Sequence, residues 1–382
     1  MNEYPWTQSF LDQMRTEGDP LADQVVDALF ANHAADEANT LLRKLGTSRE
    51  FSVDTLPPVL RDYFIQTAAI PALDEDKLLL GQQVFAEYGP EIALILACYS
   101  LPFCYADQKG VHVLYRTGFL MKRARARVFQ TLQMLMDVFS PGGMSPGGKG
   151  IVSVQKVRLM HAGVRYLLTH DAKEPWDEAR GRPVNQEDMA LTYCTFTTLV
   201  IRHGLEKLGV KLSLEQQEAY LYTWNAVGQL LGLRSELRPA TLDDADDLCR
   251  TIQERVFAET DEGRQLTASL IEALSSLLSP AFQKLPSVMM RHFLTPDPYS
   301  NKDLASMLGV PDEGGVVLRT AVTLISKICD HANNDSDLIR LINRDVSLSL
   351  FNGLLRMSHT DSASFEIPTD LYAYWKLESE AA

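Results

Sequence analysis

Apolar residues recur at three- and four-residue spacings along most of this chain, and no long stretch alternates strictly between apolar and polar residues. This spacing matches the turn of an α-helix, whereas a half-buried β-strand would show a period of two. The sequence therefore predicts an all-α fold. We expect a single large helical domain, because the two Gly- and Pro-rich loops do not separate segments that resemble independent cores.

The predicted helices are placed by this spacing and by local start signals. Capping pairs mark three of the starts: Ser213 with Gln216, Thr241 with Asp244, and Asn185 with Asp188. We expect helices near 21–44 (broken near Asn32), 57–69, 75–89, 91–105, 111–139, 151–170, 186–208, 214–232, 243–257, 262–281, 313–333 and 338–356. We expect three regions of the domain: an N-terminal helical extension (1–75), a core (76–240) and C-terminal helices packed on that core (241–382).

The charge balance excludes some partners. The 382 residues include 36 Lys and Arg against 50 Asp and Glu, which gives a net charge of −14. A chain this acidic is repelled by phosphate backbones and by anionic lipid surfaces, so we expect neither nucleic acid nor a membrane surface as partner.

Cysteine usage and the chain start indicate a cytoplasmic protein. There is no CxxC pair, and we expect reduced thiols at Cys98, Cys104, Cys194, Cys249 and Cys329. The first twenty residues lack the basic and apolar regions of a secretion signal. The most apolar run, 92–106, contains Pro102 and is shorter than the roughly 20 residues that span a bilayer.

A Gly-rich segment, 140–150, nearly matches the phosphate-binding pattern G-x-x-x-x-G-K-[ST]. It fails at the last position, where Gly150 replaces the hydroxyl that would hold Mg²⁺, and it follows a predicted helix instead of a strand. We interpret it as a connector. Metallohydrolase, α/β-hydrolase, dinucleotide-fold and di-iron motifs are all absent from the sequence.

The helix predicted over 151–170 carries the most informative residue. His161 lies in its apolar stripe, with Arg158 three residues before it and Arg165 four residues after it. A lone His in such a stripe is usually a hydrogen-bonded core residue. Alternatively, an imidazole that projects from a helix into an apolar cavity can hold haem iron, and the two arginines can then pair with the haem propionates.

The preceding helix offers polar groups that would face the same interior. Arg127 and Thr131 are four residues apart and share a face with apolar neighbours. Arg127 either extends its charged end to solvent or meets a buried anion, in which case both residues form polar points on the wall of an apolar pocket.

Two motifs together resemble a known family. The segment 156–165 (KVRLMHAGVR) followed by 181–189 (GRPVNQEDM) resembles the catalytic domain shared by latex clearing protein, a rubber oxygenase, and MpaB-type oxygenases. Weaker similarity continues through 224–232, so that the resemblance covers about residues 80 to 240.

This resemblance implies an all-α fold with a globin-like core around a b-type haem, which activates O₂ and cleaves a carbon–carbon double bond in an isoprenoid chain. His161 matches the proximal iron ligand, and Arg158 and Arg165 match the arginines beside it. Arg127 and Thr131 match an Arg/Thr pair on the distal side.

The chain departs from that family pattern in three respects. The stretch 105–113 contains Asp107 but lacks the distal Glu that serves as the proposed base in rubber-cleaving members. Gln130 replaces the distal Lys beside the cofactor. Neither a secretion signal nor a membrane segment is visible, so we expect a small apolar olefin inside the cell as substrate, not an external polymer.

Three hypotheses remain open at this point. The first is a haem b-dependent oxygenase, with His161, Arg158, Arg165 and Gln130 at the cofactor and Arg127 and Thr131 on the distal side. The second is a haem protein without oxygenase activity, such as a gas sensor or haem carrier. The third is a helical protein without a cofactor, in which His161 is a core residue.

Overall fold

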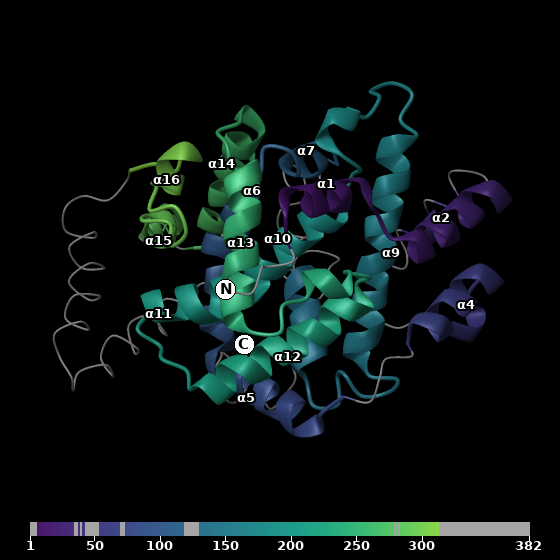
Figure 1. Cartoon of the computed structure of the whole chain (residues 1–382), viewed down its shortest axis with the longest axis horizontal. Coiled ribbons are helices and arrows are strands. Elements are labelled where there is room, and N and C mark those ends of the chain that lie inside the picture. Colours follow the sequence, from purple (N-terminus) through teal and green to yellow (C-terminus); the bar gives the residue numbers. More distant parts are fainter. Residues whose placement is uncertain are drawn as a thin grey trace.

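A computed structural model describes residues 6–33, 37–38, 40–42, 53–68, 73–117, 130–278, 280 and 283–312. These residues form one helical domain (Figure 1), and they contain no β-strand beyond an isolated bridge between Asp107 and Phe257. The all-α prediction is confirmed. The predicted helices 313–333 and 338–356 lie outside the described residues.

The α-helices are α1 (Gln8–Thr16), α2 (Pro20–Asn32), α4 (Pro58–Thr67), α5 (Glu75–Ile95), α6 (Leu101–Tyr105), α7 (Val111–Arg116), α9 (Lys149–Thr169), α10 (Gln186–Phe196), α11 (Leu205–Lys207), α12 (Leu214–Leu230), α13 (Leu242–Val256), α14 (Asp261–Ser275), α15 (Leu285–Leu294) and α16 (Leu304–Met307). A further helix covers 130–139. Two π-helical segments, η2 (Leu96–Ser100) and η4 (Leu199–Gly204), and three short 3₁₀ turns, η1 (Val53–Thr55), η3 (Glu178–Arg180) and η5 (Ser235–Leu237), complete the set.

The predicted start signals are confirmed by the caps. Ser213 and Gln216 form a reciprocal capping box at α12, and Thr241 and Asn185 accept backbone hydrogen bonds at the starts of α13 and α10. Sequence spacing did not reveal α1 or α15. Both helices are short, and their apolar positions are too few to establish a period.

Helices α5, η2 and α6 form one continuous helical run through the centre of the molecule. The backbone kinks at Tyr88 (φ −119°, ψ 17°), two residues before Pro90, and the wider π-helical turn of η2 precedes Pro102. Proline lacks an N–H donor, so a kink or an irregular turn lets the helix continue past it.

This run is longer than the sequence predicted. It extends 31 residues, from Glu75 to Tyr105, and is the one helix among the described residues long and apolar enough to cross a membrane. The length argument against a bilayer span was therefore wrong, because the prolines do not end the helix. However, 83% of its most apolar window is buried inside the protein, as expected for a core helix.

Helix α12 packs along α5 at very short range. A Cβ atom added to Gly81 of α5 would lie 2.5 Å from Oγ1 of Thr223 and 3.1 Å from the carbonyl oxygen of Ala219. The Thr223 hydroxyl already donates to that same carbonyl over 3.0 Å, so it cannot easily move aside. Gly81 thus sets the distance between the two central helices.

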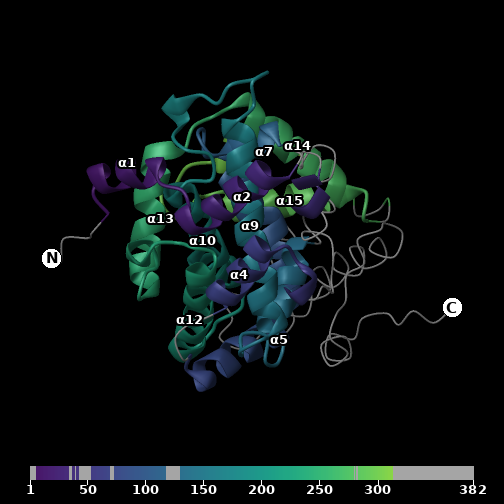
Figure 2. The same ribbon diagram turned by 90° about the vertical axis from the view of Figure 1, so that its right-hand side faces the viewer.

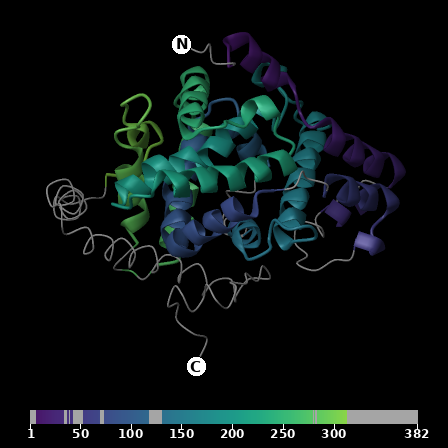
Figure 3. The same cartoon turned by 60° about the horizontal axis from the view of Figure 1, so that its bottom comes forward.

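An outer layer covers one end of the molecule. Helices α2 and α4 lie beside α9 (Figures 1 and 2), and Figure 3 shows α1 and α2, in purple, along the same side. Val26 and Leu29 of α2 and Leu60 of α4 form an apolar cluster with Leu159 and Ala162 of α9. This cluster is separate from the main core on the other side of α9.

The described cysteines are free thiols, as expected. Cys98, Cys194 and Cys249 are buried, whereas Cys104 is partly exposed. Burial raises the pKa of Cys98 to about 12 and that of Cys104 to about 11, which keeps both thiols protonated and unreactive. Cys329 lies outside the described residues.

We predict opposite effects for two glycine-to-alanine substitutions in the helices. Gly81→Ala should lower the free energy of unfolding by about 1–3 kcal/mol through overpacking. Gly163→Ala on α9, where the nearest atom to the new Cβ is Leu42 Cδ1 at 3.4 Å, should raise it by up to ~1 kcal/mol. Urea denaturation measures both, and equal effects would contradict the close approach of α5 and α12.

Candidate functional site

Helix α9 separates two apolar clusters. Its outer face contributes Leu159 and Ala162 to the cluster with α2 and α4, and its inner face contributes Ile151 and Val154 to the main core. His161 follows Val154 by seven residues, so it lies on the inner face. The His161 side chain is half-buried there.

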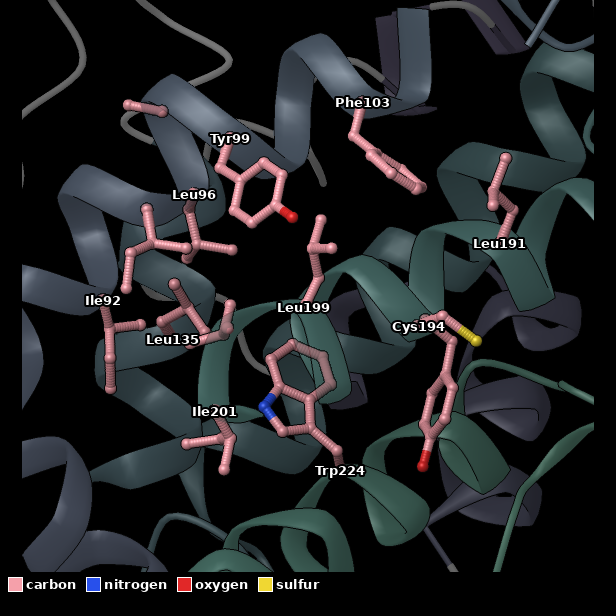
Figure 4. Close-up of a cluster of buried hydrophobic side chains, with 14 of the residues drawn as sticks. Ile92, Leu96, Tyr99, Phe103, Leu135, Leu191, Cys194, Leu199, Ile201 and Trp224 are labelled. Carbon is pink, nitrogen blue, oxygen red and sulfur yellow. The ribbon is translucent and has the colours of Figure 1, made fainter. Parts of the chain in front are cut away.

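The helix over 130–139 borders the same main core. Leu132, Leu135 and Phe139 are buried in it. Figure 4 shows Leu135 grouped with Ile92 and Leu96 from the central helical run, and with apolar side chains of η4 and α12. Thr131, one turn before Leu135, is half-buried, as is Gln130. Arg127 lies outside the described residues.

These two helices follow one another across the Gly-rich connector and contact each other beside it. A Cβ on Gly150 would lie 2.7 Å from Cα of Val138, and the Ser153 hydroxyl donates to the Asp137 carboxylate. From this contact, Thr131 is six residues back along one helix and His161 is eight residues forward along the other. At 1.5 Å per residue these steps are about 9 Å and 12 Å, so both residues lie at a similar distance along their helices from this contact.

Arg158 is held by a carboxylate from the N-terminal segment. Its Nε donates to Oδ2 of Asp19 over 2.5 Å, its Nη2 donates to Oδ1 over 2.8 Å, and its Nη1 donates to the Leu230 carbonyl. Burial is the largest single influence and lowers the pKa of Arg158, but the hydrogen bond to Asp19 and the nearby negative charge of Asp19 and Asp23 together outweigh it and raise the pKa. Gly232, at φ +79°, leaves room for the pair, because a Cβ there would lie 2.6 Å from Asp19 Oδ2.

Arg165 is held in the same way one helical turn beyond His161. Its Nε donates to Oδ1 of Asp23 over 2.6 Å, and its Nη1 donates to the Val184 carbonyl. Arg182 donates to the other oxygen of Asp23 over 2.8 Å. The two arginines beside His161 thus each have a carboxylate partner, and their predicted contact with haem propionates remains a prediction.

Residues 185–188, inside the second family motif (181–189), fasten the N-terminal segment to the core. Asn185 caps α10, and Gln186 Nε2 donates to the carbonyls of Gly18 and Gly232. Glu187, fully buried, accepts from Arg15 of α1 over 2.6 Å and from Arg255 of α13 over 2.8 Å. These side chains hold helices α1, α10 and α13 together.

Arg15 also pairs with Asp188 over 3.1 Å, and Asp107 lies near this cluster around Arg15, which comprises Arg15, Glu187 and Asp188. Asp107 is buried, and one carboxylate oxygen accepts from the Lys109 N–H over 2.9 Å. Burial raises the pKa of Asp107, and Arg15 opposes this increase. Asp107 therefore lies under the electrostatic influence of the cluster around Arg15, and its position gives no support for a role as the missing base.

Sequence analysis identified His161, Arg158 and Arg165 as candidate site residues. It did not identify the carboxylates that bind the two arginines. Asp19 and Pro20 carry a recognisable helix-start signal, and Asp19 does cap α2. No local signal connects Asp19 with Arg158, which is 139 residues away, or Asp23 with Arg165, which is 142 residues away.

Comparison with known proteins agrees with this architecture. Residues 94–326 match the family model described as "ER-bound oxygenase mpaB/B'/Rubber oxygenase, catalytic domain". The rubber oxygenase of Streptomyces sp. (strain K30) is 26% identical over 282 residues, which cover 72% of this chain and 68% of that protein. A solved structure of latex clearing protein in the closed state superposes with a TM-score of 0.72 at 22% identity, covering 90% of this chain and 91% of that chain.

The molecule is thus an all-α protein of the oxygenase class. More specifically, the chain belongs to the family of MpaB and rubber oxygenase catalytic domains. The resemblance stated from the motifs is confirmed, and the match extends past residue 240 to residue 326.

The cluster around Arg15 generates a prediction about pH. Burial raises the pKa of Asp188 to about 8, Arg15 opposes the increase, and Asp107 and Glu187 add to it. The unfolded chain releases this proton near pH 4, whereas the folded protein keeps it until about pH 8, so stability falls as the pH rises through that window.

Between pH 4 and pH 8 the free energy of unfolding should decrease less in Asp188→Asn than in the wild type. We expect the two decreases to differ by more than about 1 kcal/mol. Glu187→Gln is the contrast, because it leaves Arg15 and Arg255 without their shared carboxylate and should cost about 3–5 kcal/mol. Chemical denaturation at several pH values measures both, and an unchanged pH profile for Asp188→Asn would contradict the prediction.

Proposed function

We propose that this protein is a haem b-dependent oxygenase that uses O₂ to cleave a carbon–carbon double bond in a small, apolar, isoprenoid-like molecule. The observation that carries the proposal is the position of His161, half-buried on the core-facing side of α9, in a chain of an oxygenase family. The relative named as a rubber oxygenase supports the olefinic substrate class. A cytoplasmic location remains a prediction.

The donor chemistry around His161 suits a haem. Among the described residues, no group of three or more His, Cys, Asp or Glu side chains is arranged to hold a metal ion. His161 can offer one imidazole nitrogen, and a metal with a single protein ligand must bring its other ligands with it. A porphyrin does so, and its apolar faces suit the apolar surroundings of α9 and the helix over 130–139.

In this proposal the chain positions the reactants. A bound haem would supply the O₂ chemistry. His161 would hold it from α9, and the hydroxyl of Thr131, on the helix over 130–139, would donate a hydrogen bond to a bound reactant. Gln130 would lie beside the haem, at the position where rubber-cleaving relatives carry a Lys, and its side chain has no positive charge. The buried apolar side chains of the same core, some of them drawn in Figure 4, would exclude water from a bound group and favour an apolar substrate.

A non-catalytic haem protein is the second candidate, and the position of Asp107 favours it. The stretch in which rubber-cleaving relatives carry a distal Glu offers only this carboxyl group, which lies near the cluster around Arg15. A protein whose spectrum changes with O₂ but which converts no olefin would be a sensor or a carrier.

The first experiment is an absorption spectrum of the protein purified from haem-replete cells, with a pyridine haemochrome assay. The proposal predicts a Soret band and about one b-type haem per chain. An absent band, with no uptake of added haem, would contradict it and leave a helical protein in which His161 is a core residue.

We predict that His161→Ala abolishes or greatly reduces haem retention, because it removes the iron ligand. His112→Ala is the matched control: that imidazole, at 18% exposure, lies beside Glu262 on another helix, and the variant should retain haem. The haem content per chain after gel filtration measures both. Full occupancy with an unchanged spectrum in His161→Ala would rule out this ligand.

We predict that Thr131→Val lowers olefin turnover roughly ten-fold or more while the haem content stays constant, because one hydrogen bond of about 1–3 kcal/mol is lost. Thr169→Val is the control, since its hydroxyl donates to backbone carbonyls at the end of α9. Product formation per haem measures the effect, and equal turnover in both variants would exclude a role for Thr131.

A further inference from the structure

The two arginines beside His161 are bound by carboxylates that the family match does not include. Asp19 and Asp23 belong to the segment that leads into and begins α2, whereas the match covers residues 94–326. Asp19 pairs with Arg158 over 2.5 Å and Asp23 pairs with Arg165 over 2.6 Å. An N-terminal segment outside the matched domain therefore contacts the helix of the candidate ligand at two points.

Both ion pairs are shielded from solvent. The exposed fractions of the side chains are 12% and 4% for Arg158 and Asp19, and 2% and 11% for Arg165 and Asp23. A charge buried to this extent is strongly disfavoured without its partner, so each arginine is confined to the position of its carboxylate.

These two contacts constrain the helix on both sides of His161. Arg158 and Arg165 are seven residues apart, which is about 10.5 Å along the axis, and His161 lies between them. A rotation of α9 by one residue, about 100°, would break both ion pairs and turn the imidazole away from the core. The outer cluster of α2 and α4 further restrains the helix.

We propose that Asp19 and Asp23 are positioning residues: through Arg158 and Arg165 they fix the rotation of α9 and thus the direction of the His161 imidazole. This inference rests on the proposed function, because the direction of the His161 imidazole matters for binding only if that imidazole holds haem iron. A different role for Arg158 and Arg165 would be to bind the haem propionates. In that case Asp19 and Asp23 would compete with the propionates for the two arginines.

The test compares Asp19→Asn and Asp23→Asn with Glu17→Gln in the full-length, haem-loaded protein. Glu17 lies on the same segment but pairs with Arg234, whose side chain is 39% exposed, so it controls for the loss of one N-terminal carboxylate. The readouts are the electron paramagnetic resonance spectrum of the ferric haem and the rate of haem transfer to excess apomyoglobin.

We expect a broadened or mixed ligand signal and at least ten-fold faster haem loss in Asp19→Asn and Asp23→Asn, and no change in Glu17→Gln. Spectra and loss rates equal to wild type in both Asp variants would overturn the proposal. Slower haem loss in the Asp variants than in the wild type would also overturn the proposal. That result would mean that the arginines, once released from Asp19 and Asp23, hold the haem propionates.

Two further variants separate positioning from folding. The double variant Asp19→Asn/Arg158→Gln removes both charges together, leaves no uncompensated charge, and should fold even where Asp19→Asn does not. In a His161→Gly background with added imidazole, the ligand is no longer attached to α9, so Asp19→Asn should leave the spectrum unchanged. An equal effect of Asp19→Asn in both backgrounds would contradict an action through His161.

The apoprotein provides a readout that does not depend on haem. Diethyl pyrocarbonate modifies accessible imidazoles, and its rate at His161 is followed by peptide mass spectrometry. We expect a several-fold faster rate in Asp19→Asn and Asp23→Asn than in wild type or Glu17→Gln. If the wild-type protein takes up no haem, the proposed function fails. The modification rate at His161 still decides whether the two carboxylates orient the imidazole. Equal modification rates in all four proteins would overturn the positioning proposal.

Discussion

Buried arginines that each require a carboxylate partner control how the layers of this protein fit together. Arg15 binds Glu187, Arg158 binds Asp19 and Arg165 binds Asp23, all over about 2.6 Å or less between nitrogen and oxygen. Removal of one partner from such a pair leaves a charge in a poorly solvated place, at a cost of about 3–5 kcal/mol. Helices α1 and α2 are therefore integral parts of the fold.

The position of α9 follows from this arrangement. One face packs on the cluster of α2 and α4, another face packs on the main core, and the ion pairs join the helix to the N-cap and the first turn of α2. Close packing on two sides leaves a helix little freedom to shift or rotate. His161 lies on the core-facing side and is thus presented by a rigid element, as a ligand of a bound group requires.

The two family motifs have different physical roles in this structure. The first, 156–165, places His161 and its arginines on one helix. The second, 181–189, makes contacts that join α1, α10 and α13, with Glu187 between Arg15 and Arg255. The second motif thus stabilises the packing of helices that the family shares. The candidate site residues belong instead to α9 and to the helix over 130–139.

The sequence by itself determined the helical class, most helix positions, three caps and the candidate ligand His161, because spacing, capping and the two motifs are local properties of the chain. It did not place the ends of the central helical run, since a kink at Tyr88 and a π-helical turn allow the helix to continue through Pro90 and Pro102. Only the tertiary structure decided that Asp19 and Asp23 bind Arg158 and Arg165 and that Asp107 is buried within the electrostatic influence of Arg15. Contacts between residues more than ninety positions apart depend on how the layers pack, and no local pattern encodes them.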